Sequence, residues 1–119
     1  MGTLALEGMQ FYAYHGYYEE EQLTGAEYVV DVYLSFDFDK ASKSDKINFT
    51  INYEEVFEHT KSIMEVPSKL IEHIAEQIID RLIYHYHSLQ KIKVRVHKLN
   101  PPLSGSVEKV SVELERIVK

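Results

Sequence analysis

Alternating apolar and polar positions predict β-strands in four parts of the chain. The clearest run is residues 28–38, whose even positions are all apolar while the odd positions from Asp31 to Asp37 are polar or amphipathic. Residues 92–97 and 110–115 alternate in the same way. Such alternation gives a strand one dry face and one polar face. In residues 3–14 the apolar phase shifts at Gly8, which predicts a β-bulge.

The apolar period changes to that of a helix in the middle of the chain. Asn52, followed three residues later by Glu55, predicts a capping box at the start of a helix that contains Val56 and Met64. Pro67 ends or interrupts this helix. A second helix is predicted over residues 68–86, with two apolar rows: Leu70, Ile74, Ile78, Leu82 and Ile71, Ala75, Ile79, Ile83.

The predicted order is strand, strand, helix, helix, strand, strand. Helices grouped between two hairpins indicate an α+β domain, with an antiparallel four-stranded sheet and both helices on one face. We expect residues 1–119 to form a single domain. Long strands with open edges also predict a homo-oligomer that covers them. Residues 15–27 form a long connection between the first two strands, a place where functional groups are often carried.

The amino-acid composition argues against several classes of partner and of chemistry. The chain has 13 Lys and Arg against 19 Asp and Glu, a net charge of -6, which argues against nucleic acid or anionic membrane as a partner. No apolar stretch has the length of a membrane helix, and we expect a cytoplasmic protein. The absence of cysteine excludes disulfides, thiolate metal sites and cysteine nucleophiles.

Lys98 is the most unusual charged residue. Counting from Val94 and Val96 places it in the apolar phase of its strand, just before the Asn-Pro-Pro sequence that ends the strand. One interpretation is a lysine that snorkels from the strand end. The other is a partly desolvated amine that acts as a general acid or base.

Other candidates also carry two interpretations. Glu72 is either part of a solvated helix face or a carboxylate that accepts two hydrogen bonds from an amino-pyrimidinone edge. The run Glu19–Glu21 is typical of a solvated surface. Tyr53 is either a packing residue at a helix start or a proton relay.

Among the six histidines, His85 and His87 have a poor spacing for metal ligands on a helix, so we expect no metal site.

Five segments in register resemble the dihydroneopterin aldolase family: LEGMQFYAYHGYYEEEQLTG, VDVYLSFDFDKASKSDKI, INYEEVF, LIEHIAEQI and VRVHKLNPPL. The resemblance implies a tunnelling fold, an oligomeric barrel that is usually an octamer, and active sites between subunits. It implies cofactor-free cleavage of 7,8-dihydroneopterin, a pterin of folate biosynthesis, to 6-hydroxymethyl-7,8-dihydropterin and glycolaldehyde. Epimerisation of the substrate side chain is a further activity of the family.

Position by position, the resemblance implies roles for six residues. Lys98 matches the acid-base lysine, Tyr53 the proton-relay tyrosine and Glu21 the acid near the substrate side chain. Glu72 matches the pterin-anchoring glutamate, and Ile71 and Ile51 fall at substrate-binding positions.

One departure is Ala26, which stands where family members commonly have glutamine. Three alternatives stay open at this point. They are an epimerase of the same fold, a noncatalytic pterin-binding oligomer, and a zinc-dependent pyruvoyl-tetrahydropterin-synthase-like enzyme, the last opposed by the missing three-histidine cluster.

Overall fold

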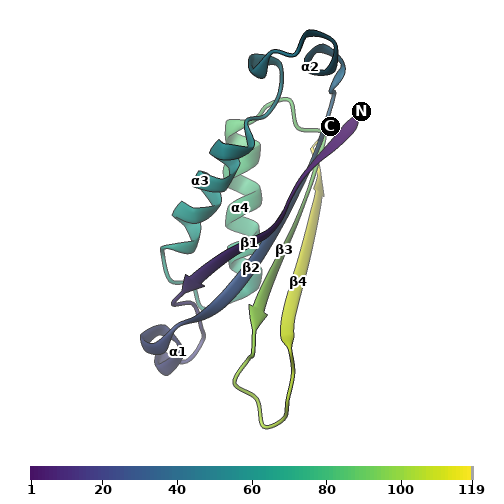
Figure 1. Cartoon of the computed structure of the whole chain (residues 1–119). Coiled ribbons are helices and arrows are strands. Elements are labelled where there is room, and N and C mark those ends of the chain that lie inside the picture. Colours follow the sequence, from purple (N-terminus) through teal and green to yellow (C-terminus); the bar gives the residue numbers. More distant parts are fainter. Residues whose placement is uncertain (119) are drawn as a thin grey trace.

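The computed structural model describes residues 1–118. Within them, an antiparallel four-stranded sheet has the order β1 (Gly2–Ala13), β2 (Ala26–Phe36), β3 (Lys91–Leu99), β4 (Lys109–Ile117). Helices α3 (Tyr53–Met64) and α4 (Ile71–His85) pack on one face of this sheet (Figure 1). The α+β class and the placement of both long helices are therefore as predicted.

The structure contains three short helical segments that the sequence pattern did not indicate. They are α1 (Glu19–Thr24), α2 (Asp39–Ser44) and a 3-10 turn at Ile47–Phe49. None of the three contains a buried residue. Because they have no buried face, they leave no apolar period in the sequence. The β1–β2 connection is thus a short helix with flanking loops.

The predicted bulge in β1 is confirmed. The pairing of β1 with β2 shifts between Leu6 and Met9, and Gly8 adopts a positive φ of 75°. The freed Gly8 N–H donates to the Asp31 carboxylate at 2.7 Å. On the same face, opposite the helices, Asp31 contacts His97 at 2.8 Å and His97 contacts Ser111 at 2.6 Å. This hydrogen-bonded row crosses the sheet from β1 to β4.

The second strand ends earlier than the alternation suggested. Its pattern continues to Phe38, but β2 ends at Phe36. The Asp37 carboxylate accepts the Asp39 N–H at 2.9 Å, a local bond that turns the chain into α2. Phe38 keeps its apolar contact by packing against Phe36 in a tilted arrangement, with ring centroids 4.7 Å apart. Because Phe38 is partly buried although it pairs with no strand, the apolar alternation in the sequence continues beyond the end of β2.

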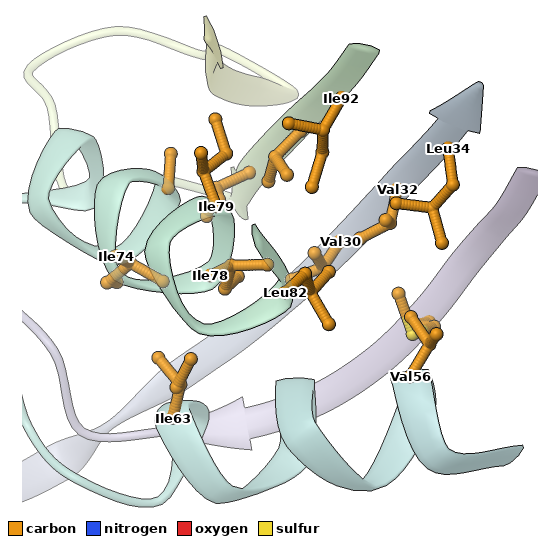
Figure 2. Close-up of a cluster of buried hydrophobic side chains, with 14 of the residues drawn as sticks. Val30, Val32, Leu34, Val56, Ile63, Ile74, Ile78, Ile79, Leu82 and Ile92 are labelled. Carbon is orange, nitrogen blue, oxygen red and sulfur yellow. The ribbon is translucent and has the colours of Figure 1, made fainter. Parts of the chain in front are cut away.

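The hydrophobic core lies between the sheet and the two long helices. Figure 2 shows side chains of α3 and α4 directed at strand residues such as Val32 and Ile92. The residues of α4 that face the sheet are almost fully buried: Ile74, Ala75, Ile78, Ile79 and Leu82. Leu70 does not join them, because α4 begins at Ile71 and the Leu70 side chain remains 52% exposed.

The start of α3 is capped by Asn52, as predicted, but without the predicted capping box. The Asn52 side chain accepts the Glu54 N–H at 3.0 Å. The Glu55 carboxylate instead accepts the Tyr86 hydroxyl at 3.0 Å. Glu55 therefore ties α3 to the end of α4 and does not return to the cap. Downstream, α3 ends at Met64, three residues before Pro67.

The arrangement of the elements defines two ends of an elongated molecule, whose principal extents are 52 × 23 × 23 Å. In Figure 1, α1, the start of α4 and the end of β3 lie at one end, while α2 and the start of α3 lie toward the other. Among the described residues, β1 and β4 each pair with a strand on one side only. None of the helices in residues 1–118 is long and apolar enough to cross a membrane.

Candidate active site

A pocket of about 720 Å³ opens at the α1 end of the molecule. Its walls come from the β1–β2 connection and the first residues of β2, from residues 69–72 at the start of α4, from Lys98 and the residues that follow β3, and from two valines of β4. The lining residues are Gly16, Tyr17, Tyr18, Glu20, Glu21, Thr24, Gly25, Ala26, Tyr28, Lys69, Leu70, Ile71, Glu72, Lys98, Asn100, Pro101, Pro102, Leu103, Val110 and Val112.

Lys98 and Glu21 form an ion pair in the wall of this pocket. The Lys98 ammonium donates to Glu21 Oε2, and the two side chains are only 13% and 17% exposed. The lysine lies on the helix-facing side of β3, in phase with Val94 and Val96. It thus does not snorkel into solvent. The hydrogen bond from Lys98 is the main cause that lowers the pKa of the Glu21 carboxyl below its usual 4.5.

Glu21 reaches Lys98 because a glycine lies beside it. A Cβ at Gly16 would come within 2.3 Å of the Glu21 Cβ, closer than two carbons approach without a bond. Glu21 is further held by the Tyr18 N–H, which donates to its Oε1 at 3.3 Å. Beneath the pair, Tyr28 lies directly opposite Lys98 in the sheet and is 1% exposed. Burial raises the pKa of the Tyr28 hydroxyl to about 12.

Glu72 lies across the pocket in the first turn of α4. The next two acids in its helical row are neutralised: Arg116 donates to both oxygens of Glu76, at 2.6 and 2.8 Å, and to Asp80 at 2.8 Å. Within residues 1–118, no side chain or N–H group forms an ion pair or hydrogen bond with the Glu72 carboxylate. Ile71 borders the same pocket. The start of α4 therefore presents an unpaired carboxylate beside an apolar side chain.

Tyr53 and Ile51 are not in this pocket. Tyr53 is the first residue of α3, at the other end of the molecule, and its side chain is 59% exposed. Ile51 is 3% exposed and packs in the core beside that helix start. One chain thus brings together Lys98, Glu21 and Glu72 with Ile71, and leaves Tyr53 and Ile51 apart.

One histidine, His15, lies next to the pocket. His15 is buried behind the lining, although the sequence pattern placed it only among scattered histidines. Elsewhere, the His59 and His85 rings pack against each other at a tilt, with ring centroids 4.3 Å apart, and His85 lies at the end of α4. Over residues 1–118, no group of three or more His, Asp or Glu side chains is arranged to hold a metal ion.

A sequence model of the family described as dihydroneopterin aldolase matches residues 4–115. The chain belongs to the dihydroneopterin aldolase family. It is 44% identical to a dihydroneopterin aldolase of Staphylococcus epidermidis over 112 residues, 93% of each chain. It is 39% identical to one of Streptococcus pyogenes over 117 residues, 98% of each chain. The family predicted from the five sequence segments is confirmed.

Solved structures of dihydroneopterin aldolases share the fold. The Escherichia coli enzyme in complex with neopterin superposes with a TM-score of 0.89 at 24% identity, covering 98% of this chain and 99% of that one. A Burkholderia dihydroneopterin aldolase bound to guanine gives 0.80 at 17% identity, with coverage of 99% and 92%. Urate oxidases also share it, as the Bacillus subtilis enzyme does at 0.71 and 11% identity, where the chain covers 46% of the larger protein.

Proposed function

We propose that the pocket at the α1 end is the active site of a dihydroneopterin aldolase. The substrate is 7,8-dihydroneopterin, and the products are 6-hydroxymethyl-7,8-dihydropterin and glycolaldehyde. The observation that carries this proposal is the Lys98–Glu21 pair, a shielded amine and carboxylate across a pocket from the unpaired Glu72. The family of the chain supports the choice of reaction.

Glu72 is proposed to bind the pterin ring. A carboxylate accepts two parallel hydrogen bonds from the amino group and ring N–H of an amino-pyrimidinone edge. Neopterin and guanine, bound by two structural neighbours, both carry such an edge. Ile71 offers an apolar surface to the flat ring. Because Arg116 already neutralises Glu76, we expect Glu72 to be the carboxylate of this row that is available to the ligand.

Lys98 is proposed to be the base. Once its ammonium group has released a proton, the Lys98 amine, or a water that it holds, takes the proton of the side-chain hydroxyl next to the bond that breaks. The electron pair of that bond moves into the conjugated imine of the dihydropterin, so glycolaldehyde leaves and an enamine remains. A proton then returns to the enamine carbon. In this scheme the substrate supplies the electron sink, and Lys98 forms no covalent adduct. Glu21 orients Lys98 and accepts hydrogen bonds from the substrate side chain.

Tyr53 is proposed to reach the pocket from a second copy of the chain, and Ile51, whose side chain is buried in the core beside the start of α3, to support it there. The site is then completed between subunits of a homo-oligomer, as the resemblance implies for an octamer. The open edges of β1 and β4 support such an assembly. In that site Tyr53 is proposed to relay a proton to the enamine, and its exposure at the start of α3 supports this role.

Epimerisation is the second candidate activity. Ala26, which replaces the common glutamine, lines the pocket next to Gly25. A smaller side chain at this point leaves more room for the cleaved aldehyde. Recombination of the aldehyde with the enamine in the other orientation would give the epimer, so product analysis must resolve both.

The test is incubation of chelator-treated protein with dihydroneopterin under anaerobic conditions, followed by chromatography of the pterins. The expected product is 6-hydroxymethyl-dihydropterin, whereas dihydromonapterin alone would assign an epimerase and unchanged substrate a binding protein. Lys98→Ala should abolish turnover and leave neopterin binding largely intact. Glu72→Ala should weaken neopterin binding by at least about 2 kcal/mol through the lost charge-assisted pair. Near-full activity of Lys98→Ala would refute the assigned base.

Complementation tests the shared site. Lys98→Ala and Tyr53→Phe are unfolded together, mixed in equal amounts and refolded. Random assembly should restore roughly a quarter of the sites, because one site in four then has both residues intact. Each variant refolded alone is the matched control. No recovery in the mixture would refute a Tyr53 contributed by another subunit.

A further inference from the structure

His15 joins two segments that are far apart in the sequence. It is 1% exposed, and its Nδ1 accepts the Ser68 N–H at 2.9 Å. The next residue, Gly16, donates its N–H to the Ser68 carbonyl at 2.9 Å. Both main-chain polar groups of Ser68 are therefore paired with consecutive residues of the β1–β2 connection. Ser68 is itself buried, so these bonds are shielded from water.

Both Ser68 and His15 are connected to residues that line the pocket. Beyond Ser68, residues 69–72 line the pocket and include Glu72. On the other side, the Tyr28 hydroxyl donates to the His15 carbonyl at 3.0 Å, and the two rings pack edge to face with centroids 5.2 Å apart. Tyr28 pairs with Lys98 in the sheet. His15 thus contacts both the support of Lys98 and the segment that leads to Glu72.

A third connection reaches the acid of the ion pair. The Gly16 carbonyl accepts the side-chain amide of Gln22 at 2.9 Å, and Gln22 follows Glu21 in α1. The His15–Gly16 dipeptide is therefore bonded to the connection before α4, to β2 and to α1. These are the elements that carry, or directly support, Glu72, Lys98 and Glu21.

We propose that His15 is a positioning residue of the active site, whose ring sets the separation between Glu72 and the Lys98–Glu21 pair. The proposal deepens the proposed function and rests on it. A pterin held by Glu72 must place its side chain at Lys98, so the spacing between the two ends decides whether bound substrate is reactive.

The ring performs this role in one protonation state. Because Nδ1 accepts a hydrogen bond, the neutral ring carries its proton on Nε2, which has no hydrogen-bond partner among the described residues. A protonated ring would direct an N–H at the Ser68 N–H and lose the contact. Burial, and next the charge of Lys98, lower the pKa of His15 to about 4, with a smaller opposing effect of the Met64 backbone. The acceptor is thus maintained at neutral pH.

The test compares His15→Phe, which fills the space without an acceptor, with His15→Asn, whose side-chain oxygen can replace Nδ1. Ile92→Val, a core change at the far end of β3, controls for general loss of stability. We expect His15→Phe to weaken neopterin binding and to lower kcat/KM for dihydroneopterin, each by roughly tenfold, since a buried N–H is left unpaired beside the pocket. His15→Asn should restore most of both, and Ile92→Val should change neither.

Amide hydrogen exchange provides a readout that does not need turnover. The Ser68 N–H should exchange slowly in the wild type, faster in His15→Phe and slowly again in His15→Asn. If His15→Phe does not fold, His15→Gln takes its place, because its longer side chain carries the oxygen beyond the Nδ1 position. Folded His15→Phe or His15→Gln with unchanged neopterin affinity, or with unchanged Ser68 exchange, would overturn the proposal.

The two proposals fail in different ways. Wild-type protein that binds neopterin but releases no aldehyde would refute the aldolase, while neopterin affinity and Ser68 exchange would still test His15. Conversely, an active wild type whose His15→Phe variant cleaves dihydroneopterin normally would refute only the role of His15.

Discussion

The buried imidazole of His15 should make folding sensitive to mild acid. An unfolded chain binds a proton at this residue near pH 6.5, whereas the folded chain binds it only near pH 4. Between these values the unfolded state holds the extra proton, so stability falls as the pH falls. The difference of about 2.5 pKa units corresponds to about 3 kcal/mol, reached near pH 4 and absent above about pH 7.

Urea unfolding followed by circular dichroism measures this loss, at one protein concentration and at several pH values from about 7 to about 4.5. The wild type is compared with His15→Asn, which does not titrate at this position. Burial also lowers the pKa of His59, and Lys98 lowers that of Glu21, so both add to acid sensitivity. The His59 and Glu21 contributions are also present in His15→Asn, so they cancel when the stability of the variant is subtracted from that of the wild type.

The free energy of unfolding of the wild type minus that of His15→Asn should therefore decrease steadily as the pH falls. The Glu21 contribution is present above its unfolded pKa of 4.5 and is lost below it, outside most of this window. A difference that stays constant from about pH 7 to about pH 4.5 would refute the reasoning.

Other substitutions test single contacts. Gly16→Ala should push Glu21 away from Lys98 and lower kcat by at least about tenfold, with a smaller effect on neopterin affinity, as steady-state kinetics and titration would show. Asn52→Ala should lower the free energy of unfolding by about 1 kcal/mol in urea, because the start of α3 loses its cap. Ile78→Ala should cost about 2–5 kcal/mol in the same assay by leaving a core cavity; a loss below that range would mean that the core closes around the gap.

The fold was readable from sequence wherever burial is periodic. Residues 28–36 alternate because one face of β2 packs under the helices, and the same periodicity placed Lys98 on the helix-facing side of β3. The short helices α1 and α2 were not readable, since neither contains a buried residue and neither therefore has an apolar period. The capping box at Asn52 failed because Glu55 has a better partner in Tyr86, a contact across 31 residues that no local motif encodes.

The site was readable only in part, for a related reason. Residues carried over from the family meet in the pocket where one chain suffices, as Lys98 and Glu21 do. Tyr53 lies at the other end of the molecule, and its role in the site rests on the proposal of a second subunit. His15 was missed because its importance lies in a contact with Ser68, 53 residues away, and a single histidine has no spacing to recognise.

The bulge at Gly8 also determines where the length of this chain can vary. Leu4 and Leu6 share the helix-facing side with Met9 only because one extra residue separates the two phases. Deleting Gly8 would leave Leu6 and Met9 two positions apart, so the leucines would keep the helix-facing side in a regular strand, and the bulge and its N–H contact with Asp31 would be lost. A one-residue deletion between Leu4 and Leu6 would instead turn Leu4 to the opposite side. During evolution the length of β1 should therefore vary by one residue at the bulge, whereas the segment from Met9 to His15 should keep a constant length.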